Sequence, residues 1–158
     1  MPNWCINDVF FKASDENLQA LKELFCKMKT KQKQDLCGQL PPFIEAEAGY
    51  FFDIDFEDED RLHYQTRWKP NIEILQQIAD KYNADFFYSY EESGNCIYGE
   101  ATYENKILTN IFLEWEDFAK YQYCEDEDKY LFEGKLYDSD FEILETMLER
   151  RKDLFLNN

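Results

Sequence analysis

Two neighbouring segments of alternating side chains, residues 50–57 and 62–69, constrain the fold of this chain more than any other feature. Apolar residues hold the even positions of the first segment, while Asp53, Asp55 and Glu57 hold odd ones. An alternation of period two is typical of β-strands with one buried face. The acidic run between the segments predicts a turn, and therefore an antiparallel hairpin. The predicted register pairs Phe56 with Leu62, Ile54 with Tyr64 and Phe52 with Thr66.

The segments around this hairpin predict a β-α-β-β-α-β order over residues 1–92. Residues 3–12 read as a strand, and Ser14 can cap the helix that follows. Pro70 suits the first turn of a second helix, and residues 86–90 form the next strand. This order is the ferredoxin-like topology, so we expect an α+β sandwich with two helices on one face of the sheet. No cysteine spacing fits an iron–sulfur cluster, so the resemblance to ferredoxins is one of topology alone.

Residues 93–158 are expected to form a C-terminal β-hairpin and helix extension, packed on the core so that the whole chain is one compact domain. Strands are predicted at 96–103, 107–113 and 130–137, whereas residues 115–123 are ambiguous between helix and strand. Asp138 or Ser139 can cap a final helix with Phe155 on its apolar side. The sheet face away from the first two helices also carries aromatics. We expect the extension, or a second copy of the chain, to cover Trp4, Phe10, Phe51 and Phe87.

The charge is distributed unevenly along the chain, whose net charge is −17. Up to Leu40 there are 6 basic and 5 acidic residues, and the rest carries 11 basic and 29 acidic ones. This balance argues against direct binding to nucleic acid or to an anionic membrane, and it permits a basic protein partner. No apolar run is long enough to span a membrane, and the opening residues lack the features of a secretion signal. The five cysteines have no zinc or redox spacing. We therefore expect free thiols and a cytoplasmic location.

The alternating acids Asp53, Asp55 and Glu57 are the candidate metal ligands. Carboxylates on one strand face can hold Mg²⁺, which would suit a metal-dependent enzyme acting on nucleotides or phosphoesters. No phosphate-binding lysine or glycine-rich loop accompanies them, and the plain alternative is a solvated strand that discourages edge pairing. His63, the single histidine, would have to act with Cys5, and the two are expected on opposite faces. We assign no catalytic residue, metal or cofactor.

Two acidic runs and one lysine cluster are the remaining candidates for binding. Lysines at 27–33 could contact phosphate, and sheet aromatics stack bases in RNA-binding domains of the same topology, but the acids around them oppose this. The acidic runs can serve solubility alone, or they can dock a basic partner. The predicted partner-binding residues are Asp58, Glu59, Asp60, Glu125, Asp126, Glu127 and Asp128.

Three segments resemble a known family. They are Met1-Pro2-Asn3-Trp4-Cys5 with Asn7, Thr66-Arg67-Trp68-Lys69-Pro70, and Tyr90-Glu91-Glu92-Ser93-Gly94 leading to Tyr98-Gly99. Together they are similar to the YubB ferredoxin-like domain family, over about residues 1–100. The resemblance implies the ferredoxin-like fold and an origin on plasmids, phages or integrated elements, and it transfers no catalytic residue. The stretch before Tyr50 and the acidic turn depart from the family's pattern.

These observations favour a non-enzymatic protein-interaction module with an acidic surface. One version is a nucleic-acid mimic, in which carboxylates imitate phosphates and occupy the groove of a nucleic-acid-binding protein. The alternatives are the metal-dependent enzyme and a structural homodimer that associates through the aromatic sheet face.

Overall fold

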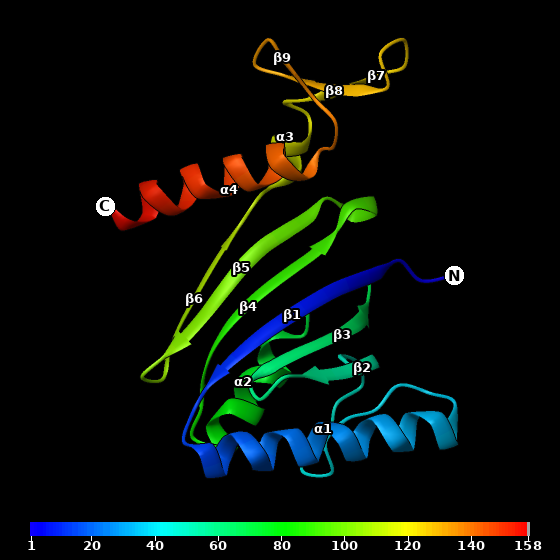
Figure 1. Cartoon of the computed structure of the whole chain (residues 1–158), viewed down its shortest axis with the longest axis vertical. Helices are drawn as coiled ribbons and strands as arrows, with labels where there is room; N and C mark the ends of the chain where they lie inside the picture. The colour runs from blue at the N-terminus through cyan, green and yellow to red at the C-terminus, as the bar shows by residue number, and fades with distance from the viewer. Residues whose placement is uncertain (158) are drawn as a thin grey trace.

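The computed structural model describes residues 1–157 and contains one large antiparallel sheet, a small second sheet and four helices (Figure 1). Among these residues no helix combines the length and the apolar character needed to cross a membrane. The elements in chain order are β1 (Trp4–Lys12), α1 (Asp15–Asp35), β2 (Phe52–Glu57), β3 (Arg61–Arg67), α2 (Ile72–Lys81), β4 (Asp85–Glu92), the 3₁₀ turn η1 (Ser93–Asn95), β5 (Ile97–Glu104), β6 (Ile107–Phe112), α3 (Trp115–Phe118), β7 (Gln122–Cys124), β8 (Lys129–Phe132), β9 (Lys135–Tyr137) and α4 (Phe141–Leu156).

The large sheet confirms the predicted ferredoxin-like topology and extends it. Its strands follow the order β2-β3-β1-β4-β5-β6, and each neighbouring pair is antiparallel. The first four strands are the predicted core, and β5 and β6 add two strands beyond β4. Helices α1 and α2 pack on one face, which we call the closed face, whereas α4 lies on the other side over β5 and β6 (Figure 1). The side of the sheet away from α1 and α2 is called the open face.

The two core helices form for reasons that their sequences contain. The Ser14 side chain accepts a hydrogen bond from the backbone of Asn17, which caps the first turn of α1 as predicted. Apolar residues then recur at helical spacing and bury against the sheet, including Leu21, Phe25 and Met28. Helix α2 begins at Ile72 without a side-chain cap, because Asn71 uses its amide elsewhere in the core.

The predicted register of the β2–β3 hairpin is right at its turn and wrong at its far end. Phe56 pairs with Leu62 as expected, but Phe52 pairs with Gln65 instead of Thr66. A β-bulge at Asp53, with φ of 47°, inserts one residue and reverses the alternation beyond it. Phe51 is therefore fully buried in the core, whereas the alternation predicts it on the opposite face, and the half-buried Phe52 takes the position on that face beside Trp4.

A chain of buried hydrogen bonds crosses the closed face. The Asn7 amide donates to Thr66 Oγ1 at 3.0 Å and accepts from the Tyr88 hydroxyl at 2.5 Å. The Tyr64 hydroxyl donates to Asn71 Oδ1 at 2.6 Å. Within residues 1–157, every buried side-chain nitrogen and oxygen has a partner. Because buried polar groups cost stability unless they are paired, this network fixes how β1, β3 and β4 meet the start of α2.

The C-terminal extension differs from its prediction at three points. Residues 130–137 form two strands, β8 and β9, since Gly134 adopts a φ of 78° and turns the chain between them. Helix α4 begins at Phe141 with Asp140 at its N-cap and no side-chain cap hydrogen bond, so neither Asp138 nor Ser139 caps it. Phe155 is exposed and is not part of the apolar face. The ambiguous segment divides into helix α3 and strand β7.

The extension has a hydrophobic cluster of its own and covers only part of the open face. Ile143, Leu144, Met147 and Leu148 of α4 pack with Leu113 and Phe132, while Tyr98 and Ile111 contact this cluster from β5 and β6. Helix α4 does not reach the aromatics of β1. Trp4, Phe10 and Phe87 stay 39–43 % exposed, so the expected cover by the extension is incomplete.

Candidate interaction surface

One half of the open face carries a row of aromatic and cationic side chains on β1 and β3. The Arg67 guanidinium lies over the rings of Phe52, at 4.8 Å, and Trp4, at 6.0 Å. The Arg61 guanidinium lies 5.3 Å from the centre of the Phe10 ring. Such cation–π contacts hold the arginine side chains along the sheet surface.

The charges in the middle of this face compensate one another. Asp8 accepts a hydrogen bond from Arg61 Nε at 3.1 Å and lies 3.4 Å from His63 Nδ1. Two basic groups thus share one partly buried carboxylate. This half of the open face is consequently aromatic, and its Asp8 carboxylate is paired with an arginine.

The other half of the open face forms a groove between the sheet and α4. Its volume is about 250 Å³. The apolar lining comes from β1, β4, β5 and the start of α4, and the rings of Tyr98 and Phe141 meet edge to face. The acidic lining comes from β1, β4, β5 and α4 as well. The residues that we call the groove are Ile6, Asp8, Phe87, Glu91, Tyr98, Glu100, Phe141 and Glu145.

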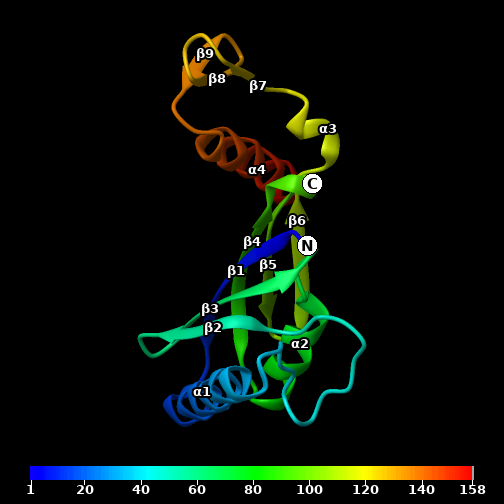
Figure 2. The same cartoon turned by 90° about the vertical axis from the view of Figure 1, so that its right-hand side faces the viewer.

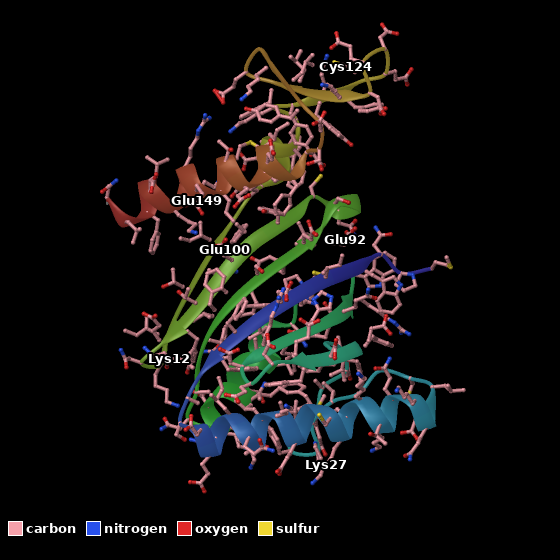
Figure 3. The ribbon with its side chains drawn as sticks, viewed as in Figure 1. Lys12, Lys27, Glu92, Glu100, Cys124 and Glu149 are labelled. Carbon is pink, nitrogen blue, oxygen red and sulfur yellow. The ribbon has the colours of Figure 1, made fainter. Side chains whose placement is uncertain are left out.

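Two groove carboxylates have no cationic partner. Glu100 is paired with Lys152 at 2.8 Å, and the same ammonium binds Glu149 at 2.8 Å. Figure 3 shows Glu100 on β5 close to Glu149 on α4. Within residues 1–157, by contrast, neither Glu91 nor Glu145 forms an ion pair. The groove therefore presents uncompensated negative charge beside apolar side chains.

The ionisation of the groove residues reflects this negative charge. Burial raises the pKa of Glu91, and the nearby Asp140 carboxylate raises it further. Burial also raises the pKa of the Tyr98 hydroxyl, and the carboxylates of Glu145 and Glu91 add to that effect. Both shifts arise because the groove disfavours further negative charge, and a cation bound there would lower both pKa values.

The structure does not bring the candidate metal ligands together. Asp53 lies in the bulge, the Asp55 carboxylate is 3.5 Å from Lys29 Nζ, and the Glu57 carboxylate is 3.8 Å from Arg61. Within the described chain, no group of three or more histidine, cysteine, aspartate or glutamate side chains has the arrangement of a metal site. Cations from α1 and β3 thus lie beside two of these acids, Asp55 and Glu57.

Cys5 and His63 lie on opposite faces, as the alternation predicted. Cys5 is buried on the closed face, where burial raises the pKa of its thiol to about 12. His63 lies on the open face beside Asp8. A thiol of high pKa without a nearby base is a poor nucleophile, so the pair cannot act as a catalytic dyad.

The two acidic runs lie in separate turns. Asp58, Glu59 and Asp60 belong to the β2–β3 turn, whereas residues 125–128 join β7 to β8. Figure 2 shows these turns at different heights of the molecule, with the β7–β9 sheet at one end. The runs therefore do not form one docking surface. The lysines of residues 27–33 belong to α1, on the closed-face side (Figure 3).

Sequence reasoning missed the groove for an identifiable reason. The alternation of β4 places Phe87 and Glu91 on one face and could have indicated its sheet side. The position of Phe141 and Glu145 over that face depends on how α4 returns to the sheet. That return is a long-range contact with no local sequence signal.

Comparison with known proteins gives one match. The profile of the family described as "Ferredoxin-like domain in Api92-like protein" matches residues 48–133, which span β2 to the end of β8 and the turn after it. No curated protein and no solved structure matches the chain. The matched description agrees with the observed topology and states no activity.

Proposed function

We propose that this chain, which belongs to the family of ferredoxin-like domains in Api92-like proteins, is a non-enzymatic protein-interaction module. Its groove binds a basic and partly apolar segment of another protein. The segment inserts lysine or arginine side chains beside Glu91 and Glu145 and covers Phe87 and Phe141.

The single observation that supports this proposal most is the setting of Glu91. Its carboxylate is partly buried, unpaired and raised in pKa, beside apolar groups that are themselves exposed. Removing a charge from water without a partner costs free energy, and a cation from a partner offsets that cost. Apolar contacts next to the charges would supply affinity, while the charges would supply specificity and rate of association.

The same charges argue against a nucleic acid as the ligand. Phosphates approaching the groove would meet Glu91, Glu100 and Glu145, and the chain as a whole carries −17. A nucleic-acid-binding protein is a better candidate partner, because its binding surface is basic. From the resemblance of the opening segment to the YubB family we further propose an origin on plasmids or phages, and a nucleic-acid-binding protein of the host as the partner.

The proposal includes a cytoplasmic location. It is supported by the five cysteines at positions 5, 26, 37, 96 and 124, none of which forms a disulfide in the described residues. Free thiols, two of them exposed, suit a reducing compartment.

Binding can be tested with a labelled peptide of alternating lysine and leucine, followed by fluorescence anisotropy against the full chain. Peptides of alternating glutamate and leucine, and of alternating lysine and serine, serve as comparisons. We expect only the lysine–leucine peptide to bind strongly, because only it offers both positive charge and apolar surface. Raising the salt concentration should weaken it.

The matched variants decide whether the groove is the site. Glu91→Gln with Glu145→Gln should weaken the peptide about tenfold, which corresponds to roughly 1.4 kcal/mol. Glu125→Gln with Asp126→Asn removes the same charge from the β7–β8 turn and should change affinity less than about twofold. Equal weakening by both pairs would show that net charge alone attracts the peptide, and the proposal would then be wrong.

A further inference from the structure

Strand β6 is an open sheet edge that lacks the usual protection against strand pairing. It pairs with β5 on one side, and no strand of the described chain pairs with its other side. Its sequence, Ile-Leu-Thr-Asn-Ile-Phe, contains no charge and no proline, although charged residues make up 32 % of the chain. The register with β5 runs without a bulge. Natural edge strands usually carry a charged residue, a proline or a β-bulge, each of which discourages pairing with another strand.

The hydrogen bonding of β6 identifies which backbone groups face outward. Leu113 donates its backbone N–H to the Tyr98 carbonyl at 2.9 Å, which makes these two residues a hydrogen-bonded pair. In an antiparallel ladder such pairs recur at every second residue, so Ile107, Thr109 and Ile111 bond toward β5. The N–H and C=O groups of Leu108, Asn110 and Phe112 therefore point away from the sheet. The side chains of Leu108 and Phe112 are also 37 % and 46 % exposed.

We propose that a second copy of this chain adds its β6 to this edge, antiparallel, about a twofold axis at Asn110. This register uses all three outward-facing residues in hydrogen-bonded pairs. It places Leu108 of one copy opposite Phe112 of the other, so apolar side chains meet. Two residues beyond each end of this pairing, Lys106 of one copy lies opposite Glu114 of the other.

Both side-chain polarity and charge favour this register over the one shifted by two residues. The shifted register would put Leu108 opposite Asn110 and Phe112 opposite Lys106, so apolar side chains would face polar ones. Lys106 contacts Asp80 in the single chain, with its side chain 58 % exposed, and is accessible to a second carboxylate. The twofold axis repeats the Lys106–Glu114 juxtaposition, so both ends of the ribbon are matched.

The long-range charge gives this dimer a distinctive salt dependence. Two chains of net charge −17 repel each other, and salt screens that repulsion. The uncharged edge itself is little affected by screening. The dimer should consequently tighten as salt rises, which is opposite to the behaviour expected of peptide binding in the groove. Failure of one proposal is thereby distinguishable from failure of the other.

Sedimentation velocity of the full chain at several concentrations, in about 0.05 M and 0.5 M NaCl, tests the proposal. We expect a monomer–dimer equilibrium whose Kd falls several-fold at the higher salt. Leu108→Lys and Phe112→Glu should each raise the Kd at least tenfold. Leu136→Lys is the matched control, because Leu136 on β9 is also 37 % exposed, and it should leave the Kd unchanged.

The double variant tests the register itself. L108K combined with F112E places opposite charges across the axis at both positions and should recover most of the lost dimer. Circular dichroism melting of each variant establishes that the monomer is folded. A chain that stays monomeric at every concentration and salt, or a dimer that L108K leaves intact, would overturn the proposal. The second result would point to a different interface, such as the aromatics of the open face.

Discussion

The two faces of the large sheet are built from the same strands and have opposite properties. On the closed face, side chains such as Val9, Tyr64 and Tyr88 are fully buried, and every buried side-chain nitrogen and oxygen of the described residues has a hydrogen-bond partner. On the open face, the intervening residues leave aromatic rings exposed and two groove carboxylates without cations. Alternation along a strand therefore separates residues that hold the fold from residues that are free to bind.

Composition alone therefore indicates other candidate binding residues than the structure does. The acidic runs that dominate the sequence lie in separate turns, whereas the groove uses carboxylates spaced among apolar residues. Charge in a solvated turn is screened and mobile. The same charge beside an apolar surface is partly desolvated, so it interacts more strongly with a ligand.

The largest expected difference between the faces is in stability, at two adjacent residues. Phe86 is buried on the closed face and Phe87 is 39 % exposed on the open face. Phe86→Ala should lower the free energy of unfolding by roughly 3–5 kcal/mol, because it leaves a cavity in a packed core. Phe87→Ala should lower it by less than about 1 kcal/mol. Urea denaturation measures both, and similar losses from the two changes would contradict the division of the sheet into faces.

The buried network of the closed face should be the next most sensitive feature. Asn7→Leu should cost roughly 3 kcal/mol of unfolding free energy, because the Tyr88 hydroxyl is left buried without an acceptor. Adding Tyr88→Phe removes that hydroxyl and should restore about 1 kcal/mol. Peptide affinity should not change in either variant. A double variant no more stable than Asn7→Leu would show that the hydroxyl finds another partner.

The open face should impose a pH dependence on binding through Glu91. The raised pKa means that this carboxylate ionises at higher pH than an ordinary glutamate, and its ionisation costs folding stability as the pH rises through that value. Bound cations favour the ionised form, so peptide affinity should increase as the pH rises through the same range. Anisotropy titrations between about pH 4 and 7 measure this slope. Glu91→Gln should flatten it, and an unchanged slope would assign the effect to another group.

The smallest expected effect concerns the cation–π row of the open face. Arg67→Ala removes the guanidinium over Trp4 and Phe52, which should lower the free energy of unfolding by only about 0.5–1 kcal/mol since the site is exposed. Arg67→Lys should lose about half of that. Urea denaturation with replicate fits can resolve the difference. A loss above about 2 kcal/mol would mean that this half of the open face also supports the fold.

The helices and strands of the core could be read from the sequence because their signals are local. Ser14 as an N-cap and the apolar spacing of α1 act within a few residues of one another. The β2–β3 turn was likewise predicted with its nearest pair, Phe56 and Leu62. The bulge at Asp53 was missed because nothing in the alternation reveals one extra residue. Gly134 is a local signal for a turn, but residues 130–137 together predict one longer strand.

The α+β class, the ferredoxin-like order of the core and the acidity of the chain follow from local sequence, because periodicity, caps and charge depend on neighbouring residues. Tertiary structure decided where the aromatics and carboxylates meet. The path of α4 over β5 creates the groove, and the addition of β6 leaves an uncharged edge. Both result from contacts between residues far apart in the chain, whose free energies depend on the assembled sheet and cannot be read from any one segment.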